Sequence, residues 1–215
     1  MIADSPEPPT PGSLNPLLVT WRKGEPILRC HDSRFGGNEY NPSEHGSGRF
    51  RPLRTDDEFV PVLYGADVFE GALAESVFHD VLAGTPEQRV FVSRFRTWVR
   101  STIAPNRDLR LVQLFGFGLR RLGLERRHLI ETGHEAYPYT ARWALALYGH
   151  PEQPDGIVWM SRLYDEAHSL MLFGTRVGRV ELDVVDVPLA LGAEVGLRTI
   201  SLLAAEADIT VVDDS

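Results

Sequence analysis

Residues 60–76 read VPVLYGADVFEGALAES, and their pattern is the clearest indication of the fold class. Its first part, residues 60–64, is a short apolar run that predicts a buried strand. A helix is predicted over residues 67–82, because apolar side chains recur there at helical spacing. Asp67 can cap the first turn, and Glu70 follows three residues later, as in a capping box. A strand that leads directly into a helix indicates a domain that mixes both elements.

The same patterns extend outward along the chain. Gly84 lies just past the predicted helix, where glycine is favoured. Residues 32–58 predict a long irregular stretch, which often carries function. Residues 87–103 fit a strand or a short helix, and residues 197–205 form an apolar or amphipathic segment. The remaining expectations are strands at 17–21, 27–30, 108–115, 156–160, 169–173 and 179–187, and a helix at 139–148. We therefore expect an α+β fold, with a mixed or mostly antiparallel sheet in two halves, surrounding helices, and a cleft between the halves.

Length and composition narrow the function classes. The 215 residues suit one domain, which we place at residues 17–215 after a flexible arm at residues 1–16 that is rich in proline and acidic residues. A net charge of −8 argues against nucleic-acid binding as the main role. The sequence contains no apolar run long enough for a membrane span, and its start does not resemble a signal peptide. One cysteine excludes an internal disulfide, and these features together predict a cytoplasmic protein.

Familiar cofactor patterns are missing from the sequence. The glycines at 116 and 118 are followed by a third at 123, which does not complete a dinucleotide-binding pattern. The seven histidines are scattered without the spacing of metal ligands on one helix, so we predict no metal site. The arginines at 120, 121, 126 and 127 could contact an acidic partner, but a solvated face is the simpler interpretation.

Six short segments follow one another along the chain: Leu28-Arg29, Gly48-Arg49-Phe50, Val62-Leu63-Tyr64, Ala74-Glu75, Asp155 to Ser161, and Leu172-Phe173. Taken in this order, they resemble the motifs of the RES-domain family. The resemblance covers about residues 27–176 and leaves a C-terminal extension after about residue 177. It implies a fold similar to ADP-ribosyltransferases and an NAD-degrading toxin of a toxin–antitoxin pair. An antitoxin of the Xre helix-turn-helix type is the implied partner, and a homodimer is also compatible with the family.

The resemblance implies that NAD is a substrate, with phosphate as an optional co-substrate and no cofactor. Cleavage of the nicotinamide–ribose bond produces an oxocarbenium-like state, which the carboxylate of Glu75 can stabilise. The fork of Arg49 suits the pyrophosphate, and Arg29 is a second candidate. Tyr64 can stack on the nicotinamide, and Ser161 can hold an amide or a ribose hydroxyl. Glu75, Arg49 and Ser161 are thus the predicted catalytic residues, and Tyr64, Arg29 and Arg49 the predicted substrate-binding residues.

Each of these residues also has a purely structural interpretation. Glu75 could be a solvated helix residue, Tyr64 a core residue and Ser161 a strand-end cap. Arg49 could pair with loop carboxylates such as Glu44 or Asp57. The protein could also transfer ADP-ribose to a protein target, or act as a binding module without catalysis.

One departure from the family pattern concerns spacing. Fifteen positions separate Arg49 from Tyr64, and the charged insertion at residues 52–58 lies between them. This insertion could form a lid or a partner loop, or it could displace Arg49 from the site.

Overall fold

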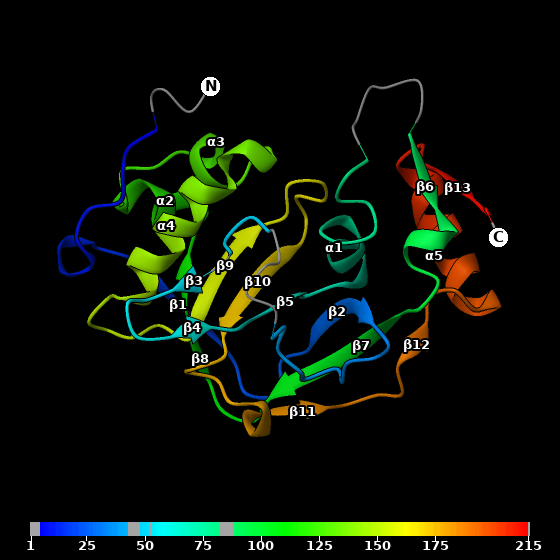
Figure 1. Ribbon diagram of the computed structural model, residues 1–215, viewed down its shortest axis with the longest axis horizontal. Coiled ribbons are helices and arrows are strands. Elements are labelled where there is room, and N and C mark those ends of the chain that lie inside the picture. The colour runs from blue at the N-terminus through cyan, green and yellow to red at the C-terminus, as the bar shows by residue number, and fades with distance from the viewer. Residues whose placement is uncertain (1–4, 43–47, 52, 82–87, 215) are drawn as a thin grey trace.

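The computed structural model describes residues 5–42, 48–51, 53–81 and 88–214 (Figure 1). Within these ranges the chain folds around one curled, mixed sheet of nine strands. Its strands are β1 (Leu18–Trp21), β2 (Ile27–Asp32), β5 (Val62–Ala66), β7 (Trp98–Pro105), β8 (Leu109–Gln113), β9 (Gly156–Met160), β10 (His168–Phe173), β11 (Leu182–Val184) and β12 (Leu189–Ala190).

The order across the sheet is β1-β8-β9-β10-β5-β2-β7-β11, and β12 also pairs with β7. The β8–β9 pair is parallel and the other pairs of this sheet are antiparallel. Two smaller sheets pair β3 (Leu53–Arg54) with β4 (Phe59–Val60), and β6 (Arg89–Phe91) with β13 (Thr210–Val212). The predicted α+β class with a mixed sheet is confirmed.

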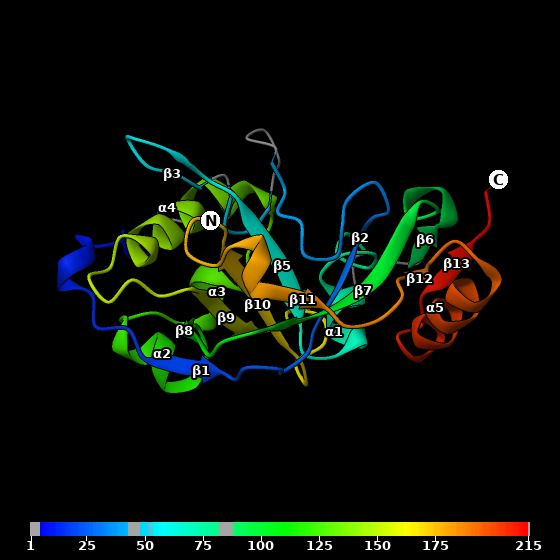
Figure 2. The ribbon, with the colours of Figure 1, turned by 90° about the horizontal axis from the view of Figure 1, so that it is seen from below.

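The helices gather at two ends of the sheet (Figures 1 and 2). The helices α2 (Gly116–Arg121), α3 (Arg126–Leu129) and α4 (Tyr137–Tyr148) lie beside β8 and β9, whereas α1 (Phe69–Ala74) packs on β2 and β5, and α5 (Glu194–Glu206) packs on β12 and β13. Short 3₁₀ turns occupy Pro11–Ser13, Val92–Arg94, His134–Ala136 and Arg179–Glu181. In the described ranges, no helix combines the length and the apolar character that crossing a bilayer requires.

The central strands are buried on both faces, which explains their continuous apolar sequences. Because side chains alternate along a strand, Ile157 and Trp159 of β9 join one apolar cluster with Trp143 of α4. Val158, between them, belongs to a cluster on the opposite face with Leu170. The period-two pattern of β9 thereby sets which face Trp159 presents. Strand β10 lies between β9 and β5, and residues in the middle of β5 line the candidate site.

The N-terminal and C-terminal segments both pack on this frame. The carbonyl of Pro6 accepts hydrogen bonds from the Tyr139 hydroxyl (2.7 Å) and the Trp143 indole (3.0 Å), both on α4. At the other end, Ile200 of α5 packs in one cluster with Leu73 of α1. The division into an arm and a domain at residue 17 stays a prediction.

The helix predicted over residues 67–82 is wrong in length and in its cap. Helix α1 spans only Phe69–Ala74 and has Val68 at its N-cap, without a side-chain cap bond. The carboxylate of Asp67 instead accepts hydrogen bonds from the backbone and ring of His168 (3.0 and 2.9 Å). After Ala74 the chain leaves the helix at Glu75, because tertiary contacts of Glu75 outweigh local helix propensity. Gly84, predicted to follow the helix, lies outside the described residues.

Other boundaries also differ from the sequence patterns. The strand predicted at 179–187 is a 3₁₀ turn followed by the three-residue strand β11, since the Glu181 carboxylate accepts a hydrogen bond from the Gly178 amide and tightens that turn. Residues 197–205 lie within α5, which is longer than the predicted segment.

Candidate functional site

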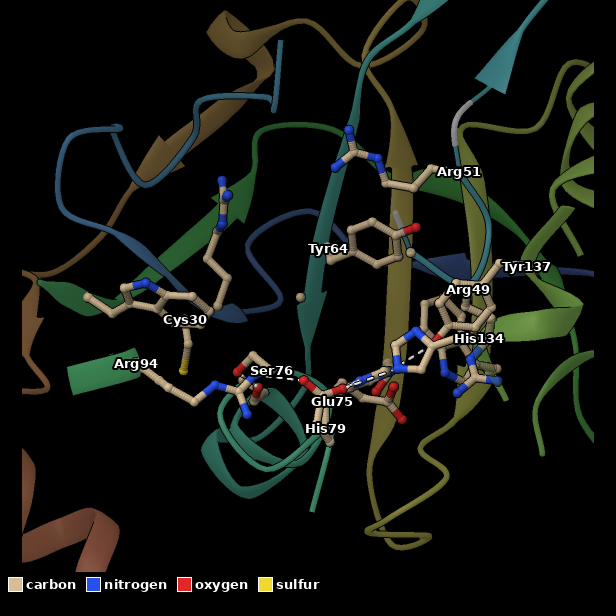
Figure 3. A pocket seen from close by; sticks show the side chains of 18 residues that line it. Cys30, Arg49, Arg51, Tyr64, Glu75, Ser76, His79, Arg94, His134 and Tyr137 are labelled. Carbon is tan, nitrogen blue, oxygen red and sulfur yellow. Dashed lines mark hydrogen bonds and ion pairs between the residues drawn. The ribbon is translucent and has the colours of Figure 1, made fainter. Parts of the chain in front are cut away.

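A cavity of about 400 Å³ lies among the middle residues of β2 and β5, the end of α1 and the segments around Arg49 and Tyr137 (Figure 3). Arg29, Arg49, Tyr64 and Glu75 all line it, although they are far apart in the sequence. Ser161, the fifth predicted residue, has no exposed surface and is not part of the lining. The volume falls in the range of roughly 300–1,000 Å³ that is usual for small-molecule sites.

Glu75 is held by one oxygen only. Its Oε1 accepts hydrogen bonds from the Ser161 hydroxyl and from the backbone amide of Arg162, both at 2.8 Å. Its Oε2 accepts no hydrogen bond from the described residues. The sharp end of α1 directly before Glu75 turns this side chain toward β9, where Ser161 follows the last residue of the strand. One carboxylate oxygen is thus fixed while the other remains available to a ligand.

Ser161 reaches the cavity only through Glu75. Besides donating to Glu75, its hydroxyl accepts weak hydrogen bonds from the amides of Leu163 (3.4 Å) and Tyr164 (3.3 Å). The expected direct contact of Ser161 with an amide or ribose hydroxyl has no geometric support here. Its contacts are those of a positioning residue that orients the carboxylate.

Arg49 is a nearly buried cation with unused donors. Among the described residues, only Nη1 of its side chain donates hydrogen bonds, to Thr132 Oγ1 (2.9 Å), the Thr132 carbonyl (3.2 Å) and the Leu129 carbonyl (3.4 Å). Nε and Nη2 are buried and have no hydrogen-bond partner among the described residues. Burial lowers the pKa of Arg49, and the nearby Glu75 carboxylate opposes that shift. Buried, unpaired N–H groups are costly, so they indicate a missing acceptor.

The local structure explains how Arg49 is placed. The hydroxyl of Thr140 on α4 donates to the carbonyl of Arg49 and fixes the loop, and the guanidinium lies 5.9 Å from the centre of the Tyr137 ring. Within the part of the chain that the structure describes, Arg49 forms no hydrogen bond or ion pair with Asp57, and Glu44 lies outside that part. The insertion at residues 52–58, of which 53–58 are described, contains β3 and the turn before β4 and leaves Arg49 in the cavity.

Arg29 and Tyr64 line the cavity from the paired strands β2 and β5. Arg29 Nη1 donates to the carbonyls of Gly37 (2.9 Å) and Glu39 (2.8 Å), and burial lowers the pKa of Arg29 to about 10. Burial also raises the pKa of Tyr64, so its hydroxyl stays protonated. The Tyr64 ring meets Trp159 edge-on, with ring centres 6.3 Å apart. Tyr64 therefore combines core packing with exposure to the cavity.

Several lining residues escaped the sequence patterns. Trp159 and Ser169 each present a buried polar atom without a partner among the described residues. Trp159 could have been found, because it lies two positions before Ser161 on the same face of a strand. Arg51, Arg94, His79, Asp80, His134 and Tyr137 also line the cavity, and no local spacing connects them.

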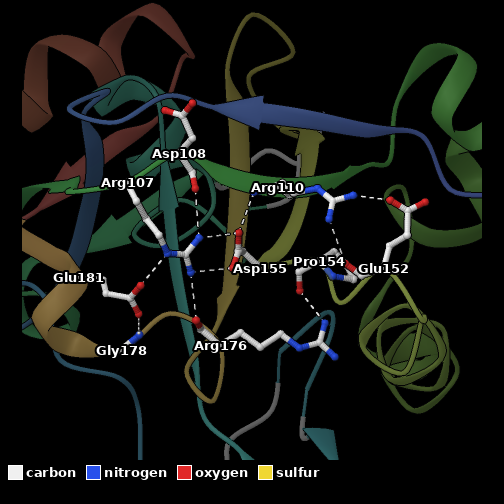
Figure 4. Close-up of polar contacts among 9 residues, drawn as sticks. All are labelled: Arg107, Asp108, Arg110, Glu152, Pro154, Asp155, Arg176, Gly178 and Glu181. Atoms are coloured by element: carbon white, nitrogen blue, oxygen red, sulfur yellow. Dashed lines mark hydrogen bonds and ion pairs between the residues drawn. The ribbon is translucent and has the colours of Figure 1, made fainter.

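A separate polar network lies at the other end of β9 (Figure 4). Asp155, which precedes the strand, accepts two hydrogen bonds from the guanidinium of Arg107 (2.9 and 2.8 Å) and one from the backbone amide of Arg110 (2.8 Å). Arg107 also binds Glu181 through Nε (2.6 Å). None of these four residues lines the cavity, so this part of the family motif supports the fold.

Comparisons with known proteins agree with this architecture. The model of the RES domain matches residues 26–192, most of the chain. No protein among those with curated functions matches the chain. The chain is similar in structure to a protein solved in the crystal structure of the M. tuberculosis MbcT–MbcA toxin–antitoxin complex, with a TM-score of 0.56, 17% sequence identity, and coverage of 80% of this chain and 87% of that one. At this identity the likeness supports the fold, whereas the domain match covers both the sheet and the cavity. The protein is a member of the RES-domain family.

Proposed function

We propose that the cavity binds NAD and that the protein cleaves the bond between nicotinamide and ribose. The observation that carries this proposal is that two complementary groups line one cavity. Glu75 has one oxygen fixed and one free, and buried Arg49 has donors without a partner among the described residues. NAD offers what each group lacks: a ribose that becomes cationic during cleavage, and a pyrophosphate that accepts bidentate hydrogen bonds.

The chemistry assigns Glu75 an electrostatic role. When the C–N bond breaks, its electron pair leaves with nicotinamide and positive charge develops on the ribose. A fixed carboxylate beside that carbon stabilises this charge without reorganising. The oxygen of water or of phosphate then forms the new bond to the ribose carbon and gives up its proton. The product is ADP-ribose with water, or its phosphorylated form with phosphate.

The charge of the lining supports an anionic ligand. Four arginines and two carboxylates are found among the described lining residues, in a chain whose net charge is −8. Positive charge concentrated in a cavity of an acidic protein attracts anions selectively. Trp159 and Tyr64 add aromatic surface for a base or a nicotinamide ring.

Incubation of the pure protein with NAD tests the proposal. We expect nicotinamide release, measured by chromatography, with and without added phosphate. Mass left on a protein target would instead support ADP-ribosyl transfer. If NAD neither turns over nor raises the melting temperature of inhibitor-free protein, the cavity is not an NAD site.

Arg49→Lys tests anion recognition. Lysine keeps the charge and loses the planar fork, so we expect KM for NAD to rise roughly 10–100-fold, as the loss of charged hydrogen bonds predicts. Arg176→Lys is the matched control, because Arg176 also donates to backbone carbonyls, of Pro154 and Tyr148, and stays outside the cavity. A lower melting temperature with an unchanged KM would assign Arg49 a structural role only.

Ser161→Ala tests positioning of the carboxylate. The variant removes one of two hydrogen bonds to Glu75 Oε1, so we expect kcat to fall by about 10–100-fold with little change in KM. Ser101→Ala is the control, since this buried hydroxyl bonds His31 Nε2 (2.9 Å) away from the cavity. If both variants lose the same stability and only Ser161→Ala loses kcat, Ser161 positions the Glu75 carboxylate. An unchanged kcat in Ser161→Ala contradicts that role.

We further propose that the protein acts as the toxin of a toxin–antitoxin pair, with a small antitoxin that covers the cavity. The family match and the structural neighbour from a toxin–antitoxin complex support this proposal. Expression of the active protein alone is expected to deplete cellular NAD and stop growth, and coexpression of the neighbouring reading frame to restore both. An Xre-type antitoxin and a homodimer stay predictions.

A further inference from the structure

Two histidines and one aspartate meet at the rim of the cavity. His79 Nδ1 lies 2.9 Å and His134 Nε2 3.3 Å from the same oxygen, Oδ1 of Asp80. The three potential ligand atoms all lie within 4.8 Å of one another. The two histidines are 55 positions apart, so the tertiary fold rather than a local motif assembles this set.

We propose that His79, Asp80 and His134 bind one divalent transition-metal ion of the zinc class. Two imidazole nitrogens and one carboxylate oxygen form a ligand set that zinc accepts, at distances of about 2.0–2.2 Å, with a fourth position left open. The three atoms are already close enough for small side-chain rotations to bring them around one ion.

Tyr137 supplies the support that metal-binding histidines usually have. Its hydroxyl lies 3.1 Å from Nε2 of His79, the ring nitrogen that faces away from Asp80. In the His79 tautomer with the proton on Nδ1, that nitrogen donates to Asp80 and Nε2 accepts from the Tyr137 hydroxyl. With metal on Nδ1, the proton moves to Nε2, which then donates to the tyrosine oxygen. A hydroxyl can serve as donor or acceptor, so Tyr137 satisfies both tautomers without a buried unpaired atom.

The surroundings leave the site accessible. The side chains of His134 and Asp80 are 67% and 40% exposed, and His79 is 20% exposed. Arg94 binds the other oxygen of Asp80, Oδ2, at 2.6 Å, so Oδ1 remains for an ion. The positive charge of Arg94 weakens the attraction of Asp80 for a metal cation, so we expect a lower affinity than that of the tightest zinc sites. All three ligands line the cavity, so the open coordination position of a bound ion would face the cavity. This proposal is independent of NAD cleavage.

The test uses untagged, metal-free full-length protein and titrates Zn²⁺ by calorimetry, with Co²⁺ absorption as a spectroscopic probe of coordination. We expect one equivalent to bind, with an absorption spectrum typical of tetrahedral or five-coordinate Co²⁺. His134→Ala, which removes an exposed side chain, and Asp80→Asn should each weaken binding by about 100-fold or more. Tyr137→Phe should weaken it by roughly 10–100-fold, the usual effect of losing an outer hydrogen bond.

His168→Ala is the matched control, because His168 forms a comparable pair with Asp67 (2.9 Å) that contains a single histidine. It should retain wild-type binding. Absence of binding in the wild type overturns the proposal, and so does binding that survives His134→Ala and Asp80→Asn. If either variant changes the melting temperature of the metal-free protein, the other variant and the Co²⁺ spectrum decide the result.

Discussion

Glu75→Gln is expected to abolish most NAD cleavage while leaving the protein folded. The amide keeps an oxygen that can accept from Ser161 and from the Arg162 amide, so the hydrogen bonds that fix the side chain survive. The negative charge beside the ribose is lost. Removing one fixed electrostatic contact to a transition state costs about 10²–10³-fold in kcat, and loss of a full charge should reach at least that range.

Glu75→Gln is not expected to weaken substrate binding, although it lowers kcat. The Glu75 carboxylate partly offsets the charge of Arg49, since it raises the pKa that burial lowers. Without that counter-charge, Arg49 should attract the pyrophosphate as strongly as before or more strongly. We therefore expect Kd for NAD to stay unchanged or fall, which calorimetry on the inactive variant measures directly.

Glu70→Gln is the control for this variant. Glu70 is a carboxylate in the first turn of α1, five positions before Glu75, and does not line the cavity. Its replacement should leave kcat unchanged. A Glu75→Gln protein that releases nicotinamide at nearly the wild-type rate would remove Glu75 from the chemistry.

Asp155→Ala is expected to destabilise the fold and spare the reaction. The side chain is 11% exposed and accepts two hydrogen bonds from Arg107 and one from the Arg110 amide. Breaking a buried ion pair from one side costs about 3–5 kcal/mol. Arg107 is 37% exposed and keeps its ion pair with Glu181. We therefore expect the free energy of unfolding to fall by about 3 kcal/mol, the low end of that range. For a chain of this length this corresponds to a fall in Tm of roughly 6–12 °C.

Thermal denaturation of Asp155→Ala beside Glu152→Ala measures this effect. Glu152 pairs with Arg110 in an exposed contact, which contributes at most about 1 kcal/mol. Below the melting transition, Asp155→Ala should retain kcat, because Asp155 and Ser161 flank opposite ends of β9. Equal stability losses in the two variants, or a specific loss of kcat in Asp155→Ala, would contradict this division of roles.

The sequence predicted the strands of the buried sheet well. Residues 156–160 form β9 as expected, and β10 and α4 differ from their predicted ranges by at most two residues. These segments have long apolar patterns whose period matches the element that they form. The pattern around residues 67–82 failed because the contacts of Asp67 with His168 and of Glu75 with Ser161 arise from distant segments.

Some residues of the candidate site could be predicted from the sequence and others could not. The family motifs indicated Arg29, Arg49, Tyr64 and Glu75, and the fold brings these four side chains to one cavity. Their roles stay predictions until they are measured. The His79, Asp80 and His134 cluster could not be inferred, since no spacing within one element links its members.

The most direct test of NAD cleavage is nicotinamide release under single-turnover conditions, with enzyme in excess over NAD and with phosphate present or absent. This format detects chemistry even when product release is slow. We expect that the wild-type protein converts all bound NAD to nicotinamide and an ADP-ribose product, and that Glu75→Gln binds NAD and leaves it intact. Intact NAD after incubation with saturating, folded wild-type protein would contradict it.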